Sequence, residues 1–368
     1  MALSANSNVP RAVDQELREF PVGAAVHIYR DGMVGMDPAG YLKAFEPGDR
    51  LIGVAYEESD NSSGSAAATQ CRVRTQGDFE VTVTGAAQTS IGQAVYAISD
   101  DPITASQLLT KGHPDGFFGR VIDYVSANKA LVRMKAFGEK PHPYDDGCIE
   151  IVSHFRRPHA VVNNTTAYVS CYGGGVFQLS TLGTGVGFTA GENGGCDLDQ
   201  DAVDEAAQAG VYTTDAFGVD KGITFQCKLD IDDPGGANTD HDWGLVTLLT
   251  ANSKLNFSHA DVTDKACFHV DGNSANILAW TEKTGVEDTP VDTTVDYAGG
   301  TVQDFKIIVR PAGTVEFWID NVRYLATTTF NGVATTAYLC GVVNNEKSAT
   351  ADAVSSKLTY LRVAGGES

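Results

Sequence analysis

Paired carboxylates are the side chains in this chain that could do acid–base chemistry. Asp230 and Asp232 alternate in one strand-like run, and Glu316 and Asp320 lie in another. Side chains two apart on a strand share a face at about 6.6 Å, and those four apart at about 13 Å. Cleavage of a glycosidic bond needs two carboxyls about 5 to 9.5 Å apart, which excludes Glu316 with Asp320. The spacing of Asp230 and Asp232 is tolerable, but Asp232 begins the run Asp-Asp-Pro-Gly, so we expect it to cap a turn, and we expect the chain not to be an enzyme.

Acidic residues at alternate positions raise the question of a calcium site. The run CDLDQDAVDE (196–205) begins like a calcium loop. An EF-hand loop needs Gly at its sixth position and Glu at its twelfth, where this chain has Ala202 and Gln208. We therefore exclude an EF-hand, favour solvated acidic loops and expect no cofactor. The weak calcium candidates are Asp197, Asp199 and Asp201, with Asp240 and Asp242 as a second set.

Histidine and aromatic residues offer two further kinds of site. His241 lies between two aspartates beside Trp243, which is weak evidence for a metal. Five aromatic residues could form a sugar platform, and we expect at least three of them in the core because most alternate with apolar neighbours. Trp280, beside the turn-like TEKTG run, is the best candidate for a glycan contact. The five are Trp243, Trp280, Trp318, Tyr297 and Tyr324.

The charge of the chain is strongly acidic and uneven. The formal net charge is −21, and residues 141–368 hold 13 Lys+Arg against 30 Asp+Glu, a balance of −17. Such a surface argues against a nucleic-acid partner, because phosphate contacts need clustered Lys and Arg. No apolar run approaches the roughly 20 residues that span a bilayer, so we expect no membrane association. The polar start MALSANSNVPRAVDQ predicts no secretory signal.

The seven cysteines are odd in number and show no Cys-x-x-Cys spacing. A disulfide framework or a zinc site is therefore not expected. Several alternate with apolar neighbours, so we predict free and mostly buried thiols. The seven are Cys71, Cys148, Cys171, Cys196, Cys227, Cys267 and Cys340.

Short alternating runs with frequent turn signals predict an all-β chain of two domains. We expect an extended arm over 1–20, a small β-barrel or sandwich over 21–136, a linker over 137–147 and a two-sheet jelly roll over 148–368. Residues 58–69 are small and polar and predict an exposed loop, and only 202–208 favours a helix.

The first third of the chain resembles the small decoration (cement) proteins on the outside of tailed-phage capsids. The resemblance rests on the order of several segments. It implies a base domain that forms homotrimers and binds the phage major capsid protein. The segments are VDQELREFPV (13–22), VHIYRDGMVGMDPAGYLKAF (26–45), GDRLIGVAYEESDNSSG (48–64) and RVRTQGDFEV (72–81).

The second half resembles the concanavalin-like, laminin-G-like jelly rolls through VQDFKIIVRPAGTVEFWIDNVRYLATT (302–328). The resemblance implies that the last strand, in LTYLRVA (358–364), ends beside the first. Sugar-cleaving members carry a strand motif of the type E-x-D-x-x-E, which is missing here. This fold serves sugar binding, hydrolysis and adhesion alike, so it does not by itself give a function.

These observations favour a virion protein on the outer capsid surface, assembled in the host cytoplasm, that stabilises the shell and projects a jelly roll outward. The alternative is a carbohydrate-binding adhesion module on a phage tail or spike, with a host-surface glycan as partner. The expected capsid or trimer contacts are Leu3, Val9, Arg11, Val13, Leu17 and Phe20.

Overall fold

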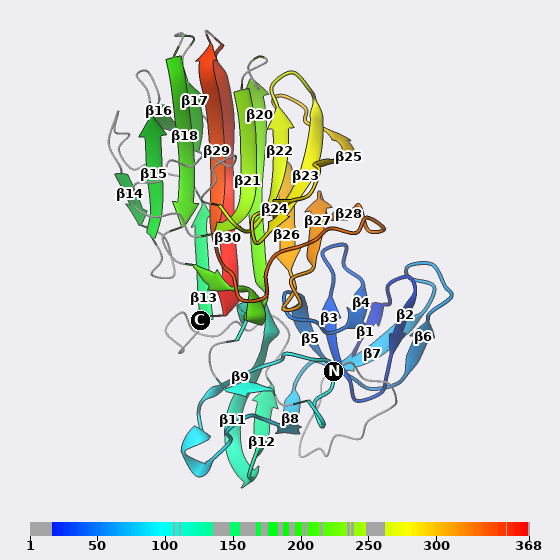
Figure 1. The fold of residues 1–368 in the computed structure, drawn as a ribbon. Coiled ribbons are helices and arrows are strands. Elements are labelled where there is room, and N and C mark those ends of the chain that lie inside the picture. Colours follow the sequence, from blue (N-terminus) through cyan, green and yellow to red (C-terminus); the bar gives the residue numbers. More distant parts are fainter. Residues whose placement is uncertain are drawn as a thin grey trace. The chain divides into compact units, whose positions relative to one another are not determined.

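The computed structural model consists almost entirely of β-strands (Figure 1). Its described part contains only three short 3₁₀ turns besides strands, at Gln88–Ser90, Pro114–Gly116 and Val219–Lys221, which confirms the all-β prediction. Within that part, no helix has the length and apolarity to cross a membrane. The structure describes residues 17–105, 107–109, 112–134, 148–154, 167–170, 176–182, 187–190, 196–200, 202, 205–213, 216–233, 236, 239–247, 262–350 and 352–366.

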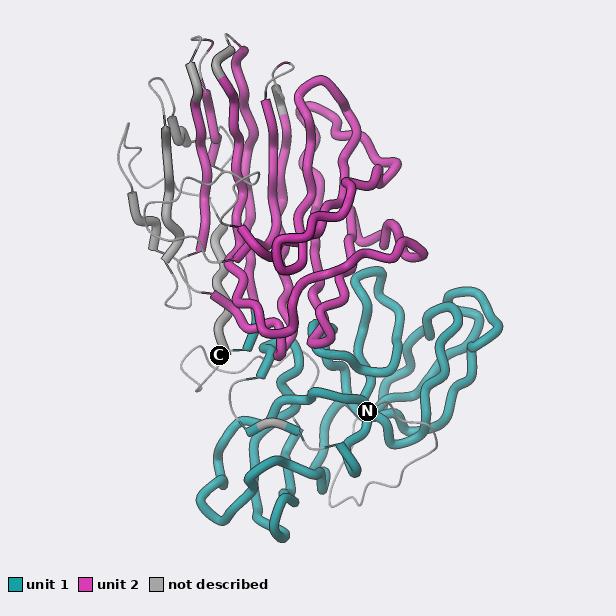
Figure 2. Tube along the Cα trace, in the orientation of Figure 1, with its two compact units in different colours: residues 1–149, 365–368 teal, residues 150–364 magenta. Residues whose placement is uncertain are grey.

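The chain divides into two compact units (Figure 2). Unit 1 comprises residues 1–149 with 365–368, and unit 2 comprises residues 150–364. The predicted linker over 137–147 lies outside the described residues.

Unit 1 contains two five-stranded antiparallel sheets and a two-stranded ribbon, and none of its described strands closes a barrel. The ribbon pairs β2 (Val26–Ile28) with β6 (Ser59–Asn61). The first sheet has the order β1 (Leu17–Pro21), β7 (Gln70–Arg74), β5 (Arg50–Ala55), β3 (Met33–Met36) and β4 (Leu42–Ala44). The second has the order β10 (Leu108–Leu109), β9 (Ala94–Tyr96), β11 (Phe117–Ser126), β12 (Lys129–Met134) and β8 (Gly77–Thr82).

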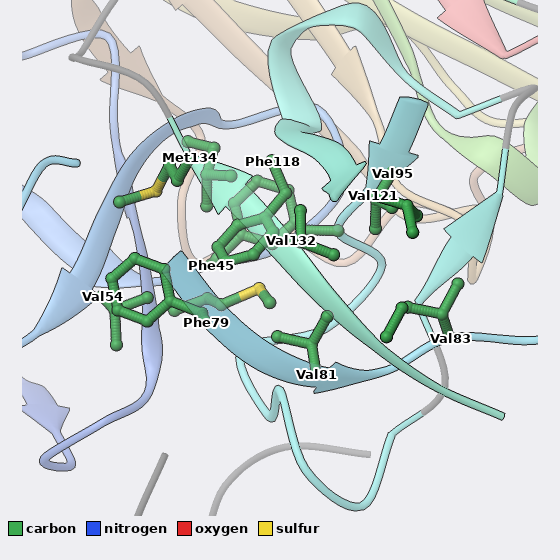
Figure 3. Packing of buried hydrophobic residues seen from close by; sticks show 14 of the residues in the cluster. Phe45, Val54, Phe79, Val81, Val83, Val95, Phe118, Val121, Val132 and Met134 are labelled. Carbon is green, nitrogen blue, oxygen red and sulfur yellow. The ribbon is translucent and has the colours of Figure 1, made fainter. Parts of the chain in front are cut away.

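The first sheet of unit 1 is apolar on both faces. Successive residues of a strand point to opposite sides, so Val54 and Ala55 enter different cores. Val54 packs with Phe79, Phe118 and Val132 of the second sheet (Figure 3). Ala55 joins a second, smaller cluster on the other side. Two cores therefore hold this sheet in place.

Two expectations for unit 1 are wrong in part, although residues 62–69 contain no strand and are mostly exposed, as the loop prediction requires. Residues 17–20 belong to β1, which pairs with β7, so the arm prediction extends too far. Its alternation is weak because β1 is an edge strand, and Leu17 remains 43% exposed. The predicted loop over 58–69 contains β6, where Asn61 is buried and its Nδ2 donates to the carbonyls of Gly23 and Ser65 at 2.7 and 2.8 Å. A small polar side chain can be buried when backbone carbonyls satisfy it.

Unit 2 consists of an eight-stranded and a ten-stranded sheet, packed as the predicted two-sheet fold. The last strand lies beside the first, as predicted, because β13 pairs with β30. The eight-stranded sheet has the order β16 (Gly187–Ala190), β17 (Cys196–Gln200), β30 (Val354–Gly366), β20 (Ile223–Asp233), β26 (Gln303–Val309), β27 (Val315–Ile319) and β28 (Val322–Tyr324), with β13 (Cys148–His154) on β30. The ten-stranded sheet has the order β14 (Ala167–Ser170), β15 (Val176–Leu182), β18 (Glu205–Thr213), β29 (Tyr338–Thr350), β21 (Thr239–Thr247), β22 (Lys265–Asp271), β23 (Asn276–Lys283) and β24 (Val286–Glu287), with β19 (Phe217–Gly218) on β29 and β25 (Val291–Asp296) on β23.

The helix predicted over 202–208 is wrong from Glu205 onward, where β18 begins. Ala, Glu and Gln favour helices by a few tenths of a kcal/mol per residue, roughly, and sheet pairing outweighs so weak a preference. Here β18 pairs with β15 on one side and with β29 on the other.

A buried ion pair lies within unit 1. The Arg74 guanidinium is fully buried, contacts Asp31 at 2.5 Å and lies 4.9 Å from the ring centre of Tyr56. Arg72 lies on the same strand and also over Tyr56, but it is solvent-exposed and pairs with Glu57. The two pairs therefore differ mainly in burial.

We predict that Asp31→Asn destabilises unit 1 by about 3 kcal/mol, because it leaves the buried charge of Arg74 uncompensated. The matched control, Glu57→Gln, should change stability little because water screens the exposed pair. Denaturant unfolding followed by far-UV circular dichroism measures both. All three tryptophans lie in unit 2, so the tryptophan fluorescence transition should not move in either variant. Equal losses in the two variants would contradict the prediction.

Candidate functional site

Trp243 on β21 fixes which side of the ten-stranded sheet faces the core of unit 2. Its ring is fully buried, 4.8 Å from the ring centre of Phe305 on β26 and 5.8 Å from that of Phe268. Residues one position before and after point the other way. Asp242 therefore lies on the opposite side, which we call the outer face of unit 2.

The outer face is defined by strand register. Figure 1 shows its central strands β18, β29, β21, β22 and β23 side by side. The residues that define it here are Tyr212, Asp240, Asp242, Lys265, Cys267, His269, Asp271, Trp280, Glu282, Cys340, Val342, Asn344 and Glu346.

Carboxylates gather in two neighbouring rows of this face. In the first row, Asp240 lies opposite Glu346 on one side and Asp271 on the other. In the second row, Asp242 lies opposite His269. The His269 Nδ1 contacts the Asp242 Oδ1 at 2.9 Å, and Asp242 is buried.

Burial and like charge shift the proton equilibria of this group. Burial, and then the nearby Asp242 and Asp240, raises the pKa of Glu346 to about 7. Burial and then Asp242 raise the pKa of Asp240, which His269 partly offsets. Burial opposes charge on His269, but Asp242 and its hydrogen bond outweigh it and raise the pKa of this imidazole above 6.5. Of these three groups, Glu346 therefore changes its charge near neutral pH.

An apolar strip follows in the third row. Trp280 lies opposite Cys267, and Tyr212 lies opposite Val342. Both rings are half-buried and pack against a small cluster that contains Cys267, Cys340 and Val342. Aromatic surface thus lies one row from the Asp242 carboxylate.

Lys265 holds Trp280 in place. Its side chain is fully buried, and its Nζ lies 3.4 Å from the centre of the indole ring. The same Nζ contacts Glu287 at 2.6 Å and Glu282 at 3.3 Å. His269 meets the indole edge-on at 5.6 Å between ring centres. One face of the Trp280 ring is therefore occupied by a cation.

Two of the proposed calcium ligands, Asp197 and Asp199, are half-buried on β17. Asp201 lies outside the described residues. No group of three or more His, Cys, Asp or Glu side chains suited to a metal occurs in the part of the chain that is described. His241 is buried between the sheets, where its Nδ1 contacts the Asn345 Oδ1 at 2.9 Å.

Glu316 and Asp320, two of the carboxylates considered for hydrolysis, have partners within the fold. Glu316 is buried, pairs with Arg310 at 2.9 Å and accepts from the Trp318 indole at 3.2 Å. Asp320 lies in the turn after β27 and accepts from the backbone N–H of Asp304. The backbone of β20 continues through Asp232 to Asp233.

The expected burial of at least three of the five aromatic residues is wrong. Only Trp243 and Trp318 are buried, and Trp280, Tyr297 and Tyr324 are half-buried. Apolar neighbours in sequence predict a strand but do not decide which of its faces is covered.

Of the predicted capsid or trimer contacts, Leu17 is exposed on β1, and Phe20 packs against the smaller core of unit 1. The others, Leu3, Val9, Arg11 and Val13, lie outside the described residues. Five cysteines among the described residues are free thiols: Cys71, Cys196, Cys227, Cys267 and Cys340.

Sequence reasoning did not single out Glu346, His269, Lys265 or Tyr212. A signal exists for the first two: Asn344-x-Glu346 and His269-x-Asp271 alternate polar residues with core residues, as Asp240-x-Asp242 does. The sequence does not say that these three strands are neighbours.

We predict that Lys265→Met destabilises unit 2 by about 2 to 4 kcal/mol, because it leaves the buried Glu282 carboxylate without its cation. The tryptophan emission of the native protein should also change, since Trp280 loses its cation contact. Denaturant unfolding followed by fluorescence measures both effects. Lys283→Met, at an exposed position of β23, the strand that carries Trp280 and Glu282, is the control and should leave both unchanged. Wild-type stability in Lys265→Met would refute the assigned role.

No protein-family model matches the chain, and no curated protein matches it. Several solved structures do. The carbohydrate recognition domain of Emp47p has 12% identity and a TM-score of 0.37, over 51% of this chain and 88% of that one. A protein of unknown function from Shewanella oneidensis MR-1 has 8% identity and a TM-score of 0.38, over 60% of this chain and 87% of that one. A glycoside hydrolase family 16 endo-glucanase from Bacteroides ovatus has 7% identity and a TM-score of 0.38, over 58% of this chain and 98% of that one. Likeness this distant leaves the function to be argued from the chain's own residues.

Proposed function

We propose that the outer face of unit 2 binds a glycan. One observation carries the proposal: the half-buried rings of Trp280 and Tyr212 lie one row from Asp242, a buried carboxylate that contacts His269. Sites for small molecules typically combine apolar and aromatic surface with a few fixed polar groups.

A sugar presents hydroxyl donors at its rim and C–H groups on its faces. The exposed carboxylate of Asp240 can accept hydrogen bonds from hydroxyls, and the buried Asp242 orients His269 beside it. Aromatic rings provide apolar surface for the C–H face. Lys265 already covers one side of the Trp280 indole, so the ligand would contact what remains of this ring. The carboxylates also disfavour anionic glycans through like-charge repulsion.

Binding without cleavage is part of the proposal, because no strand carries the E-x-D-x-x-E pattern of sugar-cleaving jelly rolls. Release of reducing ends from a bound glycan would contradict this part alone.

We predict that the full chain binds neutral glycans on an array and that Trp280→Ala weakens this binding about tenfold or more. Because Trp280 also packs against the apolar strip, Asp240→Asn is the second test; its side chain is 51% exposed, so the fold should persist while binding falls. Tyr324→Ala, a half-buried ring on the other sheet, is the matched control and should bind like wild type. The absence of any array signal, or unchanged binding in both site variants, refutes the proposal.

A second proposal concerns unit 1, which we infer to attach the chain to a phage capsid as a homotrimer. Its support is the resemblance of segments within 13–81 to decoration proteins, together with the two cores that unit 1 builds from its own strands. Many weak contacts of a trimer with neighbouring capsid subunits would add through multivalency.

Light scattering should then give three times the chain mass, and purified virions should carry hundreds of copies. A dozen copies or fewer per virion would place the protein on a tail or vertex instead. A monomer that is absent from virions would end the capsid proposal and leave the glycan proposal untouched.

A further inference from the structure

One end of the outer face of unit 2 concentrates negative charge. We call it the acidic corner and define it by Asp240, Asp242, Asp271, Glu346 and His269. Glu346, Asp240 and Asp271 form one row across β29, β21 and β22, and Asp242 with His269 follows in the next row. Directly opposite residues on antiparallel strands have Cβ atoms about 4.5 to 5.5 Å apart. Asp240 therefore has a carboxylate neighbour on each side, and Asp242 has the imidazole of His269.

The strands around the corner supply no compensating cation among their described residues. Gln208 of β18, Asn344 of β29 and Leu278 of β23 are the neighbours in the same rows, and all three are uncharged. Lys347 of β29 points to the other side of the sheet, where its Nζ donates to the Asp352 carbonyl at 3.3 Å. Lys265 of β22 lies two rows from Asp242 and pairs with Glu282 and Glu287.

The negative charge of the corner is therefore reduced by protonation of its own side chains. The pKa of Glu346 is raised to about 7 by burial and by Asp242 and Asp240. The pKa of His269 is raised above 6.5 because Asp242 outweighs the effect of burial. As the pH rises, deprotonation of Glu346 adds a negative charge and deprotonation of His269 removes a positive one, so both increase the repulsion within the corner.

We propose that the acidic corner makes the stability of unit 2 depend on pH. Protonation of its side chains stabilises the association of β29, β21 and β22 at mildly acidic pH, and deprotonation weakens this association as the pH rises. The corner lies on the same face as the proposed glycan site, but its effect on stability does not depend on glycan binding.

Protonation of Glu346 and protonation of His269 both stabilise the folded chain. The folded-state pKa of Glu346 exceeds its ordinary value of 4.5, so the folded chain binds more protons than the unfolded chain between pH 4.5 and about 7. Stability therefore falls as the pH rises through this window. The pKa of His269 also exceeds its ordinary value of 6.5, so its contribution is complete below 6.5 and is lost as the pH rises through the folded value.

The test is thermal unfolding of the full chain followed by tryptophan fluorescence, which reports unit 2 alone because Trp243, Trp280 and Trp318 all lie there. The wild-type Tm should fall by about 5 °C between about pH 5.5 and pH 8. Glu346→Gln, which mimics the protonated side chain, should raise the Tm at pH 8 and flatten the profile. Asp296→Asn removes one exposed negative charge from the same sheet and should keep the wild-type slope.

A Glu346→Gln profile parallel to wild type overturns the proposal, and so does an Asp296→Asn profile that is equally flat, because net charge alone would then explain the slope. A second measurement needs no unfolding. Protonation of His269 against the Trp280 ring should lower the native fluorescence as the pH falls from about 8 to 5.5. Trp280→Phe should abolish this change, and a persisting change would exclude His269 as its source.

Discussion

The packing of Trp243 between Phe268 and Phe305 is the contact on which the rest of unit 2 depends. It holds the ten-stranded sheet against the eight-stranded one. Because strand side chains alternate, a ring fixed in the core at Trp243 sends Asp240 and Asp242 to the opposite side. The outer face is therefore a consequence of core packing, and its rows follow from the register of β21 with β29 and β22.

The charges on this face are tolerated in different ways. A buried charge is costly unless a partner compensates it. Lys265 has Glu282, Glu287 and the face of Trp280. Burial, and then the neighbouring carboxylates of Asp242 and Asp240, raise the pKa of Glu346 to about 7, so this side chain can lose its charge instead of being paired. The face thus combines a rigid cation–aromatic element with groups whose charge follows the pH.

In unit 1 a buried charge is compensated by an internal ion pair. Its fully buried guanidinium, that of Arg74, is paired internally with Asp31 and covered by Tyr56. Such a pair fixes the fold and offers little to a ligand. Unit 1 has apolar cores on both sides of its first sheet, whereas the outer face of unit 2 combines buried charged groups with the partly exposed Asp240 and Glu346.

The sequence by itself determined the strand content and many strand positions. Short alternating runs with turn signals predicted the all-β character, and strands such as β3 and β12 follow those runs. It misjudged weakly patterned segments such as β1 and the start of β18, where partner strands outweigh local preference.

Only the tertiary structure decided the candidate site. Asp240, His269 and Glu346 lie far apart in the chain and meet because β22, β21 and β29 are neighbours. Sheet pairing is a non-local choice that alternation leaves open, since the same pattern fits many strand orders. The sequence therefore gives the chemistry of each side chain, and the strand order decides which of them act together.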